Sequence, residues 1–189
     1  MTVSTLWQAL YWAWVASEVL VLLVTRTRQS GGNVQDRGSL LLLWPVIFVS
    51  IFAGTRFGET HPHTIFGGAH WVRWASLAML SAGLAIRWTA IVTLGKSFSA
   101  NVAIHATQTV HKTGLFRFVR HPSYSGMLLI FAAIGLHTRT WVGLAILLLP
   151  TTAALLYRIH VEEGALRNAF GDEYARYSRT TKRLVPGVY

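Results

Sequence analysis

The chain has 189 residues, of which 52% are hydrophobic and 13% charged, and its mean hydropathy is +0.42. Soluble domains carry about 25% charged residues, so this composition is typical of a membrane protein. The absence of cysteine excludes disulfides, thiolate metal sites and a cysteine nucleophile, and the net charge of +10 is spread over loops between apolar segments, which argues against a nucleic-acid partner.

Five apolar segments approach the roughly 20 residues that are needed to cross the hydrocarbon core of a bilayer. They comprise residues 6–24, 40–54, 71–94, 123–136 and 141–157. The first segment has neither the basic leader nor the cleavage site of a signal peptide, so we expect it to remain as a span. Only HTRT separates the last two, which predicts a tight helical hairpin. We therefore expect an all-α polytopic membrane protein with about five transmembrane helices, forming a single domain over residues 1–189.

The distribution of Lys and Arg over the loops predicts the orientation of the spans. Apart from Arg56, Arg73 and Arg139, every basic residue of the loops falls on the side that contains residues 96–120 and the segment after Tyr157. Cytoplasmic loops are enriched in Lys and Arg. That side is therefore expected to face the cytoplasm, with the N-terminus outside, as in a bacterial inner membrane.

Two loops differ in the chemistry that they offer. The outer loop carries His61, His63 and His70, but its Gly and Pro residues predict mobility and no carboxylate completes a ligand set, so no metal site is expected. The cytoplasmic segment 95–126 is longer than a connection between neighbouring helices needs, and long ordered loops are usually functional. The functional site is therefore expected on the cytoplasmic side.

Arg87 lies within the third apolar segment, where a charged side chain costs several kcal/mol unless it reaches the interface or finds a partner. Glu18 is the only acid within a predicted span. Two interpretations remain open: Arg87 forms an ion pair with Glu18, or it lines a cavity for a substrate.

The sequence RHPSYSG, residues 120–126, stands directly before the fourth apolar segment. Pro122 lacks an amide hydrogen and suits the first turn of a helix, while His121 before it is kept out of the helical region. The free amides of residues 123–126 would then form an anion site at the positive end of the helix dipole. Arg120 is expected to anchor the chain at the membrane interface.

Polar residues follow the fifth apolar segment. Glu162 and Glu163 are adjacent, and Arg158 lies one helical turn before Glu162, so a salt bridge between Arg158 and Glu162 is one interpretation. The other is ligand recognition, in which a carboxylate holds ribose hydroxyls or an ammonium group while Arg158 holds an anion. Gly171 is placed to end this helix, and Asp172 can cap a second one.

Three motifs resemble those of the isoprenylcysteine carboxyl methyltransferase family and its bacterial and archaeal relatives. They are TGLFRFVRHPSYSG at residues 113–126, EEGALRNAFGDEYARYSRTTKRLVP at residues 162–186, and GLAIRWTAIVTLGKSFS, in which Arg87 precedes a Gly by eight residues and a Phe by eleven. The resemblance extends over residues 83–186. It implies an integral membrane enzyme that binds S-adenosylmethionine in a pocket formed by the cytoplasmic loop and the C-terminal helices, releases S-adenosylhomocysteine, and receives a lipid substrate laterally from the bilayer.

The resemblance also implies roles for individual residues. Arg87 matches the family's catalytic arginine, which would orient the substrate, and Arg158 matches an arginine assigned to the substrate. The residues implied in cofactor binding are His105, Gln108, Thr109, Val110, His111, Phe116, His121, Pro122, Ser123, Tyr124, Glu162 and Glu163. The family usually has Tyr at the position of Phe116, so a ring contact is retained and a hydroxyl contact is lost. Some members carry an acid at the position of Ser81, and Glu18 is a candidate replacement for it.

The resulting hypothesis is O-methylation, dependent on S-adenosylmethionine, of a carboxylate on a prenylated, lipid-linked or small hydrophobic acceptor at the cytoplasmic interface. A carboxylate is already ionised at neutral pH, so the reaction needs alignment rather than acid–base help, and Arg87 suits that task. The alternatives are a phospholipid N-methyltransferase, whose amine acceptor favours a general base, an NADPH-dependent sterol-type reductase, and a non-enzymatic membrane scaffold.

Overall fold

The computed structural model describes residues 2–27, 33–34, 38–61, 70–98, 103–104 and 109–189. Helices dominate this part of the chain, and their bounds are Val3–Thr27 for α1, Ser39–Thr60 for α2, His70–Leu94 for α3, Pro122–His137 for α4 and Trp141–Thr180 for α5. The smaller elements are the 3₁₀ turns η1 (Gly95–Ser97) and η2 (Gly114–Arg117) and the antiparallel strand pair β1 (Asn33–Val34) and β2 (Ala103–Ile104). The all-α prediction is confirmed.

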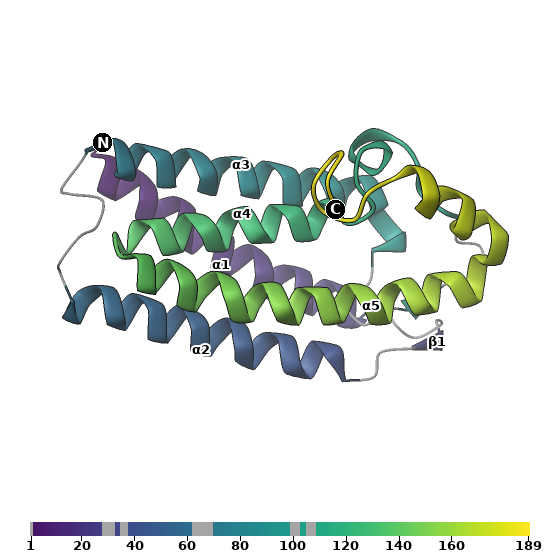
Figure 1. Ribbon diagram of the computed structural model, residues 1–189, viewed down its shortest axis with the longest axis horizontal. Helices are drawn as coiled ribbons and strands as arrows, with labels where there is room; N and C mark the ends of the chain where they lie inside the picture. Colours follow the sequence, from purple (N-terminus) through teal and green to yellow (C-terminus); the bar gives the residue numbers. More distant parts are fainter. Residues whose placement is uncertain (1, 28–32, 35–37, 62–69, 99–102, 105–108) are drawn as a thin grey trace.

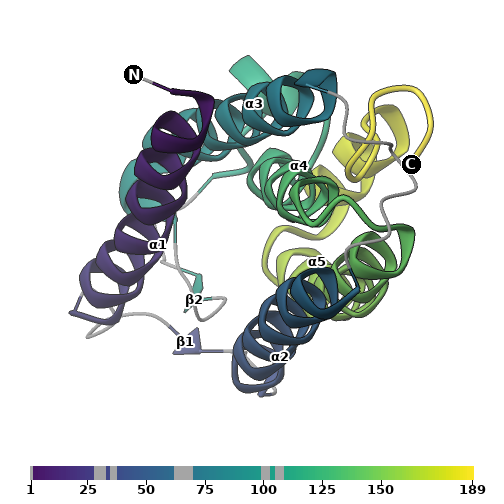
Figure 2. The ribbon, with the colours of Figure 1, turned by 90° about the vertical axis from the view of Figure 1, so that its left-hand side faces the viewer.

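The helices run side by side along the long axis of the molecule (Figure 1). Seen from the end, they form an arc in the order α1, α3, α4, α5 and α2 (Figure 2). The packing follows this order, since α4 lies between α3 and α5, α1 packs on α3, and α2 packs on α5. The two outer helices of the arc, α1 and α2, therefore flank its open side.

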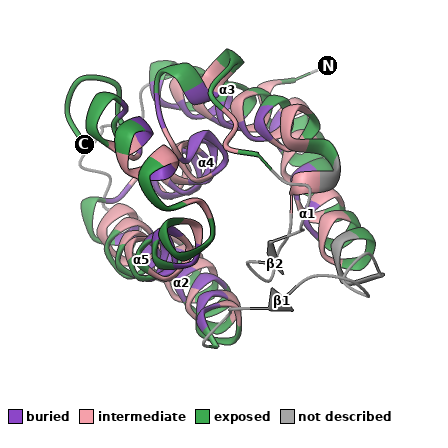
Figure 3. Ribbon diagram, turned by 90° about the vertical axis from the view of Figure 1, so that its right-hand side faces the viewer, coloured by how far each residue is buried: buried purple, intermediate pink, exposed green. Residues whose placement is uncertain are grey.

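The shortest of these helices is also the most enclosed. α4 has 16 residues, and it is drawn largely in the colour of buried residues in Figure 3, with Ile130, Phe131 and Ala133 fully inaccessible. A helix that is apolar on all sides belongs in the interior of a bundle. The fourth span can therefore be short, because its surroundings are mainly other helices.

Four of the described helices, α1, α2, α3 and α5, are long and apolar enough to cross a membrane, and α4 is a shorter apolar helix. Each predicted span falls within one of them. The second extends further than predicted, since α2 continues to Thr60 rather than ending at Gly54. Large apolar side chains such as Leu41, Phe48 and Phe52 are exposed on α2, as expected of a surface that faces lipid. The polytopic membrane fold is therefore confirmed.

The second half of α5 extends beyond its apolar segment and then reverses. Gly171 interrupts the helix with φ = 47° and ψ = −123°, a left-handed backbone that favours glycine, so the predicted end of the helix is confirmed. The chain then returns toward the start of α4 (Figure 1). There the Arg120 amide donates to the Lys182 carbonyl at 2.7 Å. The His121 amide donates to the Arg183 carbonyl at 3.0 Å.

The turn between α4 and α5 is short, as predicted. Thr138 closes α4 by donating to the Gly135 carbonyl at 2.7 Å, and Thr140 caps α5 by accepting from the Gly143 amide at 2.9 Å. Arg139 stands between the two threonines with a positive φ of 61°. This turn lies at the end of the bundle opposite to the C-terminus (Figure 1).

Candidate active site

A buried ion pair joins α1 and α3. Arg87 donates through Nε and Nη2 to both carboxylate oxygens of Glu18, with 2.6 Å between Nη2 and Oε2. The indole nitrogen of Trp14 also donates to Glu18, at 3.2 Å, and both charged residues are buried. Of the two interpretations of Arg87, the pairing with Glu18 is therefore confirmed, and its role toward a substrate stays a prediction.

The remaining side of Arg87 reaches α4. Its Nη1 donates to the Ser123 hydroxyl at 2.8 Å. This contact requires α3 and α4 to lie close together, and glycines at the crossing permit it. A Cβ at Gly126 would lie 2.7 Å from the Gly83 carbonyl oxygen and 2.8 Å from the Arg87 amide nitrogen. Gly126 of the RHPSYSG motif thus brings the guanidinium to the first turn of α4.

A second polar chain connects α2, α4 and α5. Arg158 is 2% exposed and donates to the Ser39 hydroxyl at 2.7 Å and to the Tyr124 hydroxyl at 3.2 Å. Tyr124 in turn donates to Glu162 Oε2 at 2.8 Å. The Tyr124 hydroxyl thus connects Arg158 with Glu162, and the Glu162 side chain keeps 30% of its surface exposed.

The ion pair and two residues of the polar chain, Tyr124 and Arg158, line the same cavity, of about 50 Å³. Its polar wall includes Glu18, Arg87, Tyr124 and Arg158, and its apolar wall comes largely from α2. Trp44 of α2 lines it as well, and within the described part of the chain the buried indole nitrogen of Trp44 has no hydrogen-bond partner. Sites for small molecules usually occupy about 300–1,000 Å³. A nucleoside-sized ligand would therefore require the cavity to widen.

Glu163 lies among arginines. It is 2% exposed and accepts hydrogen bonds from Arg120 at 2.9 Å and from Arg183 at 3.0 Å, while Arg167 lies 3.5 Å away. His121 Nε2 lies 3.4 Å from the same carboxylate. The hydrogen bond from Arg183 to the Glu163 carboxylate raises the pKa of this guanidinium above its usual value. We refer to these residues as the Glu163 cluster, which fastens the C-terminal tail to the start of α4.

Two predictions for the start of α4 are wrong. Arg120 is not a membrane-interface anchor, because its side chain is 8% exposed and is bonded to Glu163 and to backbone carbonyls near the end of α5. The amides of Tyr124 and Ser125 are not free to bind an anion, since both donate to the His121 carbonyl, at 3.0 and 3.1 Å. The helix entrance itself is as predicted, with Pro122 in the first turn and a non-helical backbone before it.

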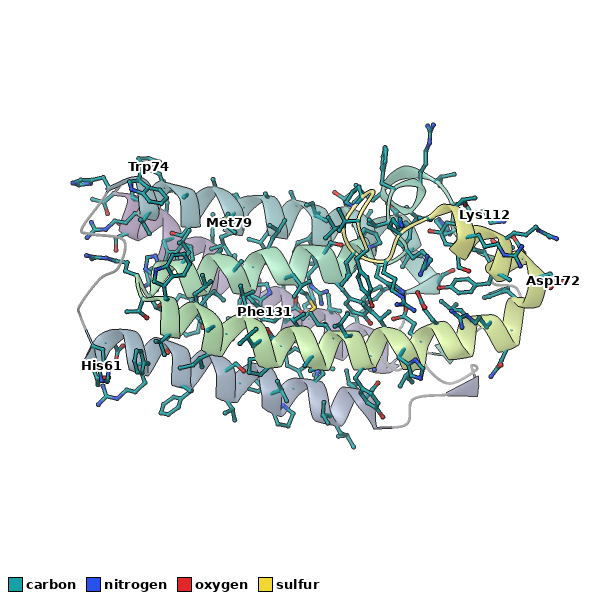
Figure 4. The ribbon with its side chains drawn as sticks, in the orientation of Figure 1. His61, Trp74, Met79, Lys112, Phe131 and Asp172 are labelled. Atoms are coloured by element: carbon teal, nitrogen blue, oxygen red, sulfur yellow. The ribbon has the colours of Figure 1, made fainter. Side chains whose placement is uncertain are left out.

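The cytoplasmic loop, which is predicted to cover the cofactor site, includes the segment around η2. The Phe116 ring is buried and lies edge-on to the His111 ring, with centroids 5.9 Å apart. The Phe116 carbonyl accepts a hydrogen bond from the Tyr177 hydroxyl at 2.6 Å. η2 is therefore held against the second half of α5, above the start of α4 (Figure 4, near the labelled Lys112).

The structure describes only some of the other loop residues that are predicted to contact the cofactor. Thr109 is exposed and Val110 is partly buried. His105 and Gln108 lie outside the described residues, as does His63 of the outer loop. The cofactor contacts assigned to this segment stay predictions.

Two contributors to the site were not predicted from the sequence. Ser39, 1% exposed, starts α2 and binds Arg158, and Trp44 lines the cavity one turn further on. Serine and tryptophan are ordinary residues at the start of a membrane helix, so the sequence offers no local signal for either.

The part of the chain that builds this site also carries its similarity to known proteins. Residues 76–168 match a family model described as the isoprenylcysteine carboxyl methyltransferase family. The chain is therefore similar to this family over about half of its length. The matched stretch contains Arg87, the start of α4, Arg158 and both glutamates of α5. The motifs that carry the resemblance therefore coincide with the residues that meet at the cavity and in the Glu163 cluster.

Individual relatives are similar over part of their length. The chain is 31% identical over 132 residues to protein-S-isoprenylcysteine O-methyltransferase B of Arabidopsis thaliana, covering 62% of this chain and 61% of that protein. It is 36% identical over 86 residues to methanethiol S-methyltransferase 1 of Bradyrhizobium diazoefficiens, covering 45% and 29%. A solved structure of the eukaryotic intramembrane Ras methyltransferase matches with a TM-score of 0.63 and 24% identity, over 77% of this chain and 52% of that one, which shows a shared fold. The chain spans less than two thirds of the length of each of these proteins.

One position departs from the family pattern. Where some members carry an acid on the helix of the catalytic arginine, this chain has Ser81, whose hydroxyl donates to the Leu77 carbonyl at 2.9 Å. The acid beside Arg87 comes instead from α1, as Glu18. Phe98, the last residue of the family's Arg–Gly–Phe spacing, lines the same cavity.

Proposed function

We propose that the protein transfers a methyl group from S-adenosylmethionine to a carboxylate of a lipid-linked or small hydrophobic acceptor at the cytoplasmic face of the membrane. The observation that carries the proposal is the presence of two buried arginines, Arg87 and Arg158, on one otherwise largely apolar cavity. Guanidinium groups at membrane depth are costly and mark functional sites. Together they suit an acceptor with an anionic head and an apolar body.

The chemistry requires alignment more than proton transfer. S-adenosylmethionine, when bound, supplies an electrophilic methyl group on a sulfonium. A carboxylate oxygen of the acceptor forms the new C–O bond as the S–C bond breaks, the electron pair of that bond stays on sulfur, and the products are a methyl ester and S-adenosylhomocysteine. The carboxylate is ionised at neutral pH and needs no base.

Arg87 is the residue proposed to align the acceptor. A guanidinium has five N–H groups. Among the described residues, Glu18 accepts from two of them and Ser123 from one, and no described residue accepts from the second N–H of Nη1 or of Nη2. Two coplanar N–H groups match the two oxygens of a carboxylate. In this proposal Glu18 is a positioning residue, which fixes the plane of the guanidinium and offsets its charge, and Arg158 provides a second contact for the acceptor.

The cofactor is proposed to lie beside Glu162. Tyr124 donates to Oε2 of this partly exposed carboxylate, and no described residue donates to Oε1, which could therefore accept from ribose hydroxyls or an ammonium group. The His121 ring stacks on Tyr124, with centroids 5.6 Å apart, so both rings can form one wall with Pro122 and Ser123. The carboxylate acceptor and the two rings fit S-adenosylmethionine, which has hydroxyl and ammonium donors.

The remaining cofactor residues of the proposal belong to the cytoplasmic loop or to α5. Those of the loop are His105, Gln108, Thr109, Val110, His111 and Phe116, of which His105 and Gln108 lie outside the described residues. Glu163 contributes indirectly, because arginines occupy its carboxylate and its effect on the cofactor site passes through His121.

We also propose that this end of the bundle faces the cytoplasm of a bacterial inner membrane, with the N-terminus outside. Arg56, Arg73 and Arg139 belong to the opposite end, while the Glu163 cluster and the basic tail lie at the end of the candidate site (Figure 1). This asymmetry follows the positive-inside rule.

A second candidate acceptor is a small thiol. The similarity to methanethiol S-methyltransferase 1 and the narrowness of the cavity favour a small acceptor. A thiol must lose its proton to become a nucleophile, and Glu18 is the carboxylate that lines the cavity. The similarity to isoprenylcysteine carboxyl methyltransferases does not favour phospholipid N-methylation or NADPH-dependent reduction.

Turnover with defined acceptors tests the proposal. Purified protein in nanodiscs is incubated with S-adenosylmethionine and either an N-acetylated S-prenylcysteine or methanethiol, and the products are identified by mass spectrometry. A methyl ester of the prenylcysteine is the expected product. Methylation of the thiol alone would show that the acceptor is a thiol and not a carboxylate. Absence of S-adenosylhomocysteine with both acceptors would contradict the proposed reaction.

A further inference from the structure

A second and larger cavity, of about 510 Å³, lies at the end of the bundle opposite to the candidate active site. α1 contributes Trp7 and Tyr11 to its walls, α2 contributes Glu59, and the end of α4 with the following turn contributes His137 and Arg139. This is the left-hand end in Figure 4. Among the residues with a described position, the two cavities share no lining residue. The larger one is therefore a separate site, with a volume in the range of about 300–1,000 Å³ that is typical of ligand sites.

One wall of this cavity is rigid and aromatic. The Trp7 ring stacks on the His137 ring, with centroids 4.0 Å apart and an interplanar angle of 5°, and Trp7 is 4% exposed. Ser76 of α3 lies 3.5 Å from His137 Nδ1. Tyr11 continues the wall one turn further along α1. Packed rings of this kind form a preformed surface rather than a gap between mobile side chains.

Arg139 has an unusual backbone at this site. A non-glycine residue with φ = 61° is held in a sparsely populated conformation, and such residues concentrate at functional sites. The hydrogen bonds of Thr138 and Thr140 fix the turn on both sides. Arg139 is partly buried, and no carboxylate of the described residues lies within ion-pair distance of it. The guanidinium is therefore available to an anion in the cavity.

A carboxylate, that of Glu59 on α2, also lines this cavity. α2 packs closely against the turn between α4 and α5, because a Cβ added at Gly58 would lie only 2.9 Å from the Thr138 Cβ. Glu59 follows Gly58 and Arg139 follows Thr138, and both residues line the cavity. Glu59 pairs with Arg56 at 3.2 Å, but both side chains are more than 60% exposed and such pairs are weak. The cavity thus offers one positive and one negative group to a ligand.

The surroundings of the cavity are those of a membrane interface. Trp71, Trp74 and Trp141 are exposed at this end of the bundle, in the manner of an interfacial aromatic belt. On α2, Phe52 lies two turns before Glu59 and is 72% exposed, so the face that lines the cavity continues as an apolar surface toward the middle of the helix. A ligand with a charged head at the cavity and an apolar tail along α2 fits both features.

We propose that this cavity binds the headgroup of a zwitterionic phospholipid. Its phosphate would accept hydrogen bonds from Arg139, its ammonium group would lie against Glu59 and the Tyr11 ring, and its acyl chains would follow α2. The site belongs to the leaflet opposite to the candidate active site. It does not depend on the methyltransferase proposal, because no residue of that proposal takes part.

Native mass spectrometry of the full chain released from detergent tests this inference. Phosphatidylethanolamine and phosphatidylglycerol with the same acyl chains are added in parallel, together with soluble glycerophosphoethanolamine. One phosphatidylethanolamine is expected to be retained in preference to phosphatidylglycerol, since only the former has an ammonium group for Glu59. Equal retention of both lipids, or equal binding of the soluble headgroup, would overturn the proposal.

Single substitutions test the charges of Arg139 and Glu59 one at a time, without disrupting the fold. Arg139→Gly removes the guanidinium and accepts the positive φ without strain, so it should keep the melting temperature and weaken retention of both lipids by about tenfold or more. Glu59→Gln should remove the preference for phosphatidylethanolamine while retaining the phosphate contact. Arg73→Gln, at the same end but outside the cavity, is the control. Unchanged retention in Arg139→Gly, or an equal loss in Arg73→Gln, would refute a specific site.

Discussion

The adjacent glutamates of α5 belong to two regions that use charge in opposite ways. In the Glu163 cluster, the carboxylate is engaged by Arg120, Arg183 and His121, and the cluster joins the tail to the start of α4. In the second region, Glu162 is partly exposed, and Arg87, which lines the cavity, keeps N–H groups that no described residue engages. The comparison suggests a general distinction: charges that saturate one another hold the fold, and charges with unused donors or acceptors are prepared for a ligand.

The largest expected effect on stability comes from removing the charge of Glu163. Glu163→Gln removes the negative charge beside the buried Arg120 and should lower the free energy of unfolding by about 3–5 kcal/mol, the usual cost of leaving a buried charge without its partner. Thermal unfolding in detergent measures this loss. Glu173→Gln is the control, because Glu173 is 43% exposed in its pair with Lys112 and should cost about 1 kcal/mol or less. Equal losses of stability in the two variants would show that the Glu163 cluster stabilises the fold no more than an exposed ion pair does.

Arg87→Lys tests whether the guanidinium of Arg87 aligns the acceptor. Lysine keeps the charge but lacks the planar fork, so turnover should fall about 100-fold or more while affinity for S-adenosylhomocysteine and the melting temperature stay close to those of the parent protein. Steady-state kinetics beside calorimetry separates these effects. A variant that exchanges Glu18 and Arg87 and remains active would show that the pair serves only the fold.

Gly126→Ala should disturb both properties at once. The added Cβ would meet the Gly83 carbonyl and the Arg87 backbone, so α3 must shift, at a cost of about 1–3 kcal/mol in unfolding free energy together with lost turnover. Gly164→Ala in α5 is the matched control, since nothing lies within 4 Å of a Cβ there and alanine favours a helix. A Gly126→Ala protein with full activity would contradict the role of the close crossing.

Tyr124→Phe should have the smallest effect of this series. It removes the hydroxyl between Arg158 and Glu162 and retains the ring beside His121. Both hydrogen bonds of this hydroxyl involve a charged partner, and such bonds contribute about 1.5–3 kcal/mol, less where the partner is partly exposed, as Glu162 is. Affinity for S-adenosylhomocysteine should therefore fall severalfold, as measured by calorimetry, and unaltered affinity would place the hydroxyl outside the cofactor site.

Local patterns were sufficient to predict the helices and the entrance to α4. Apolar runs of the right length determine the spans, Pro122 determines where α4 begins, and Gly171 determines where α5 breaks, because each of these depends on neighbouring residues. The importance of Arg87 was also predictable, because a charge inside an apolar segment needs a partner or a function.

Contacts between distant parts of the chain were harder to predict. The pairing of Arg87 with Glu18 joins residues 69 positions apart, so the sequence could suggest it only as one of two interpretations. Arg120 was assigned to the membrane interface because arginines before apolar segments usually lie there, whereas its partner Glu163 comes 43 residues later. The return of the tail beside α4 depends on the break at Gly171, and no local pattern indicates where the tail then packs.

The most direct test of the central claim is calorimetric titration of the detergent-solubilised protein with S-adenosylhomocysteine, beside a titration with NADPH. The account predicts that S-adenosylhomocysteine binds to the parent protein and to Glu173→Gln, that Glu162→Ala loses this binding with little change in melting temperature, and that NADPH does not bind. Binding of NADPH alone, or undiminished binding of S-adenosylhomocysteine to Glu162→Ala, would contradict the proposed cofactor site.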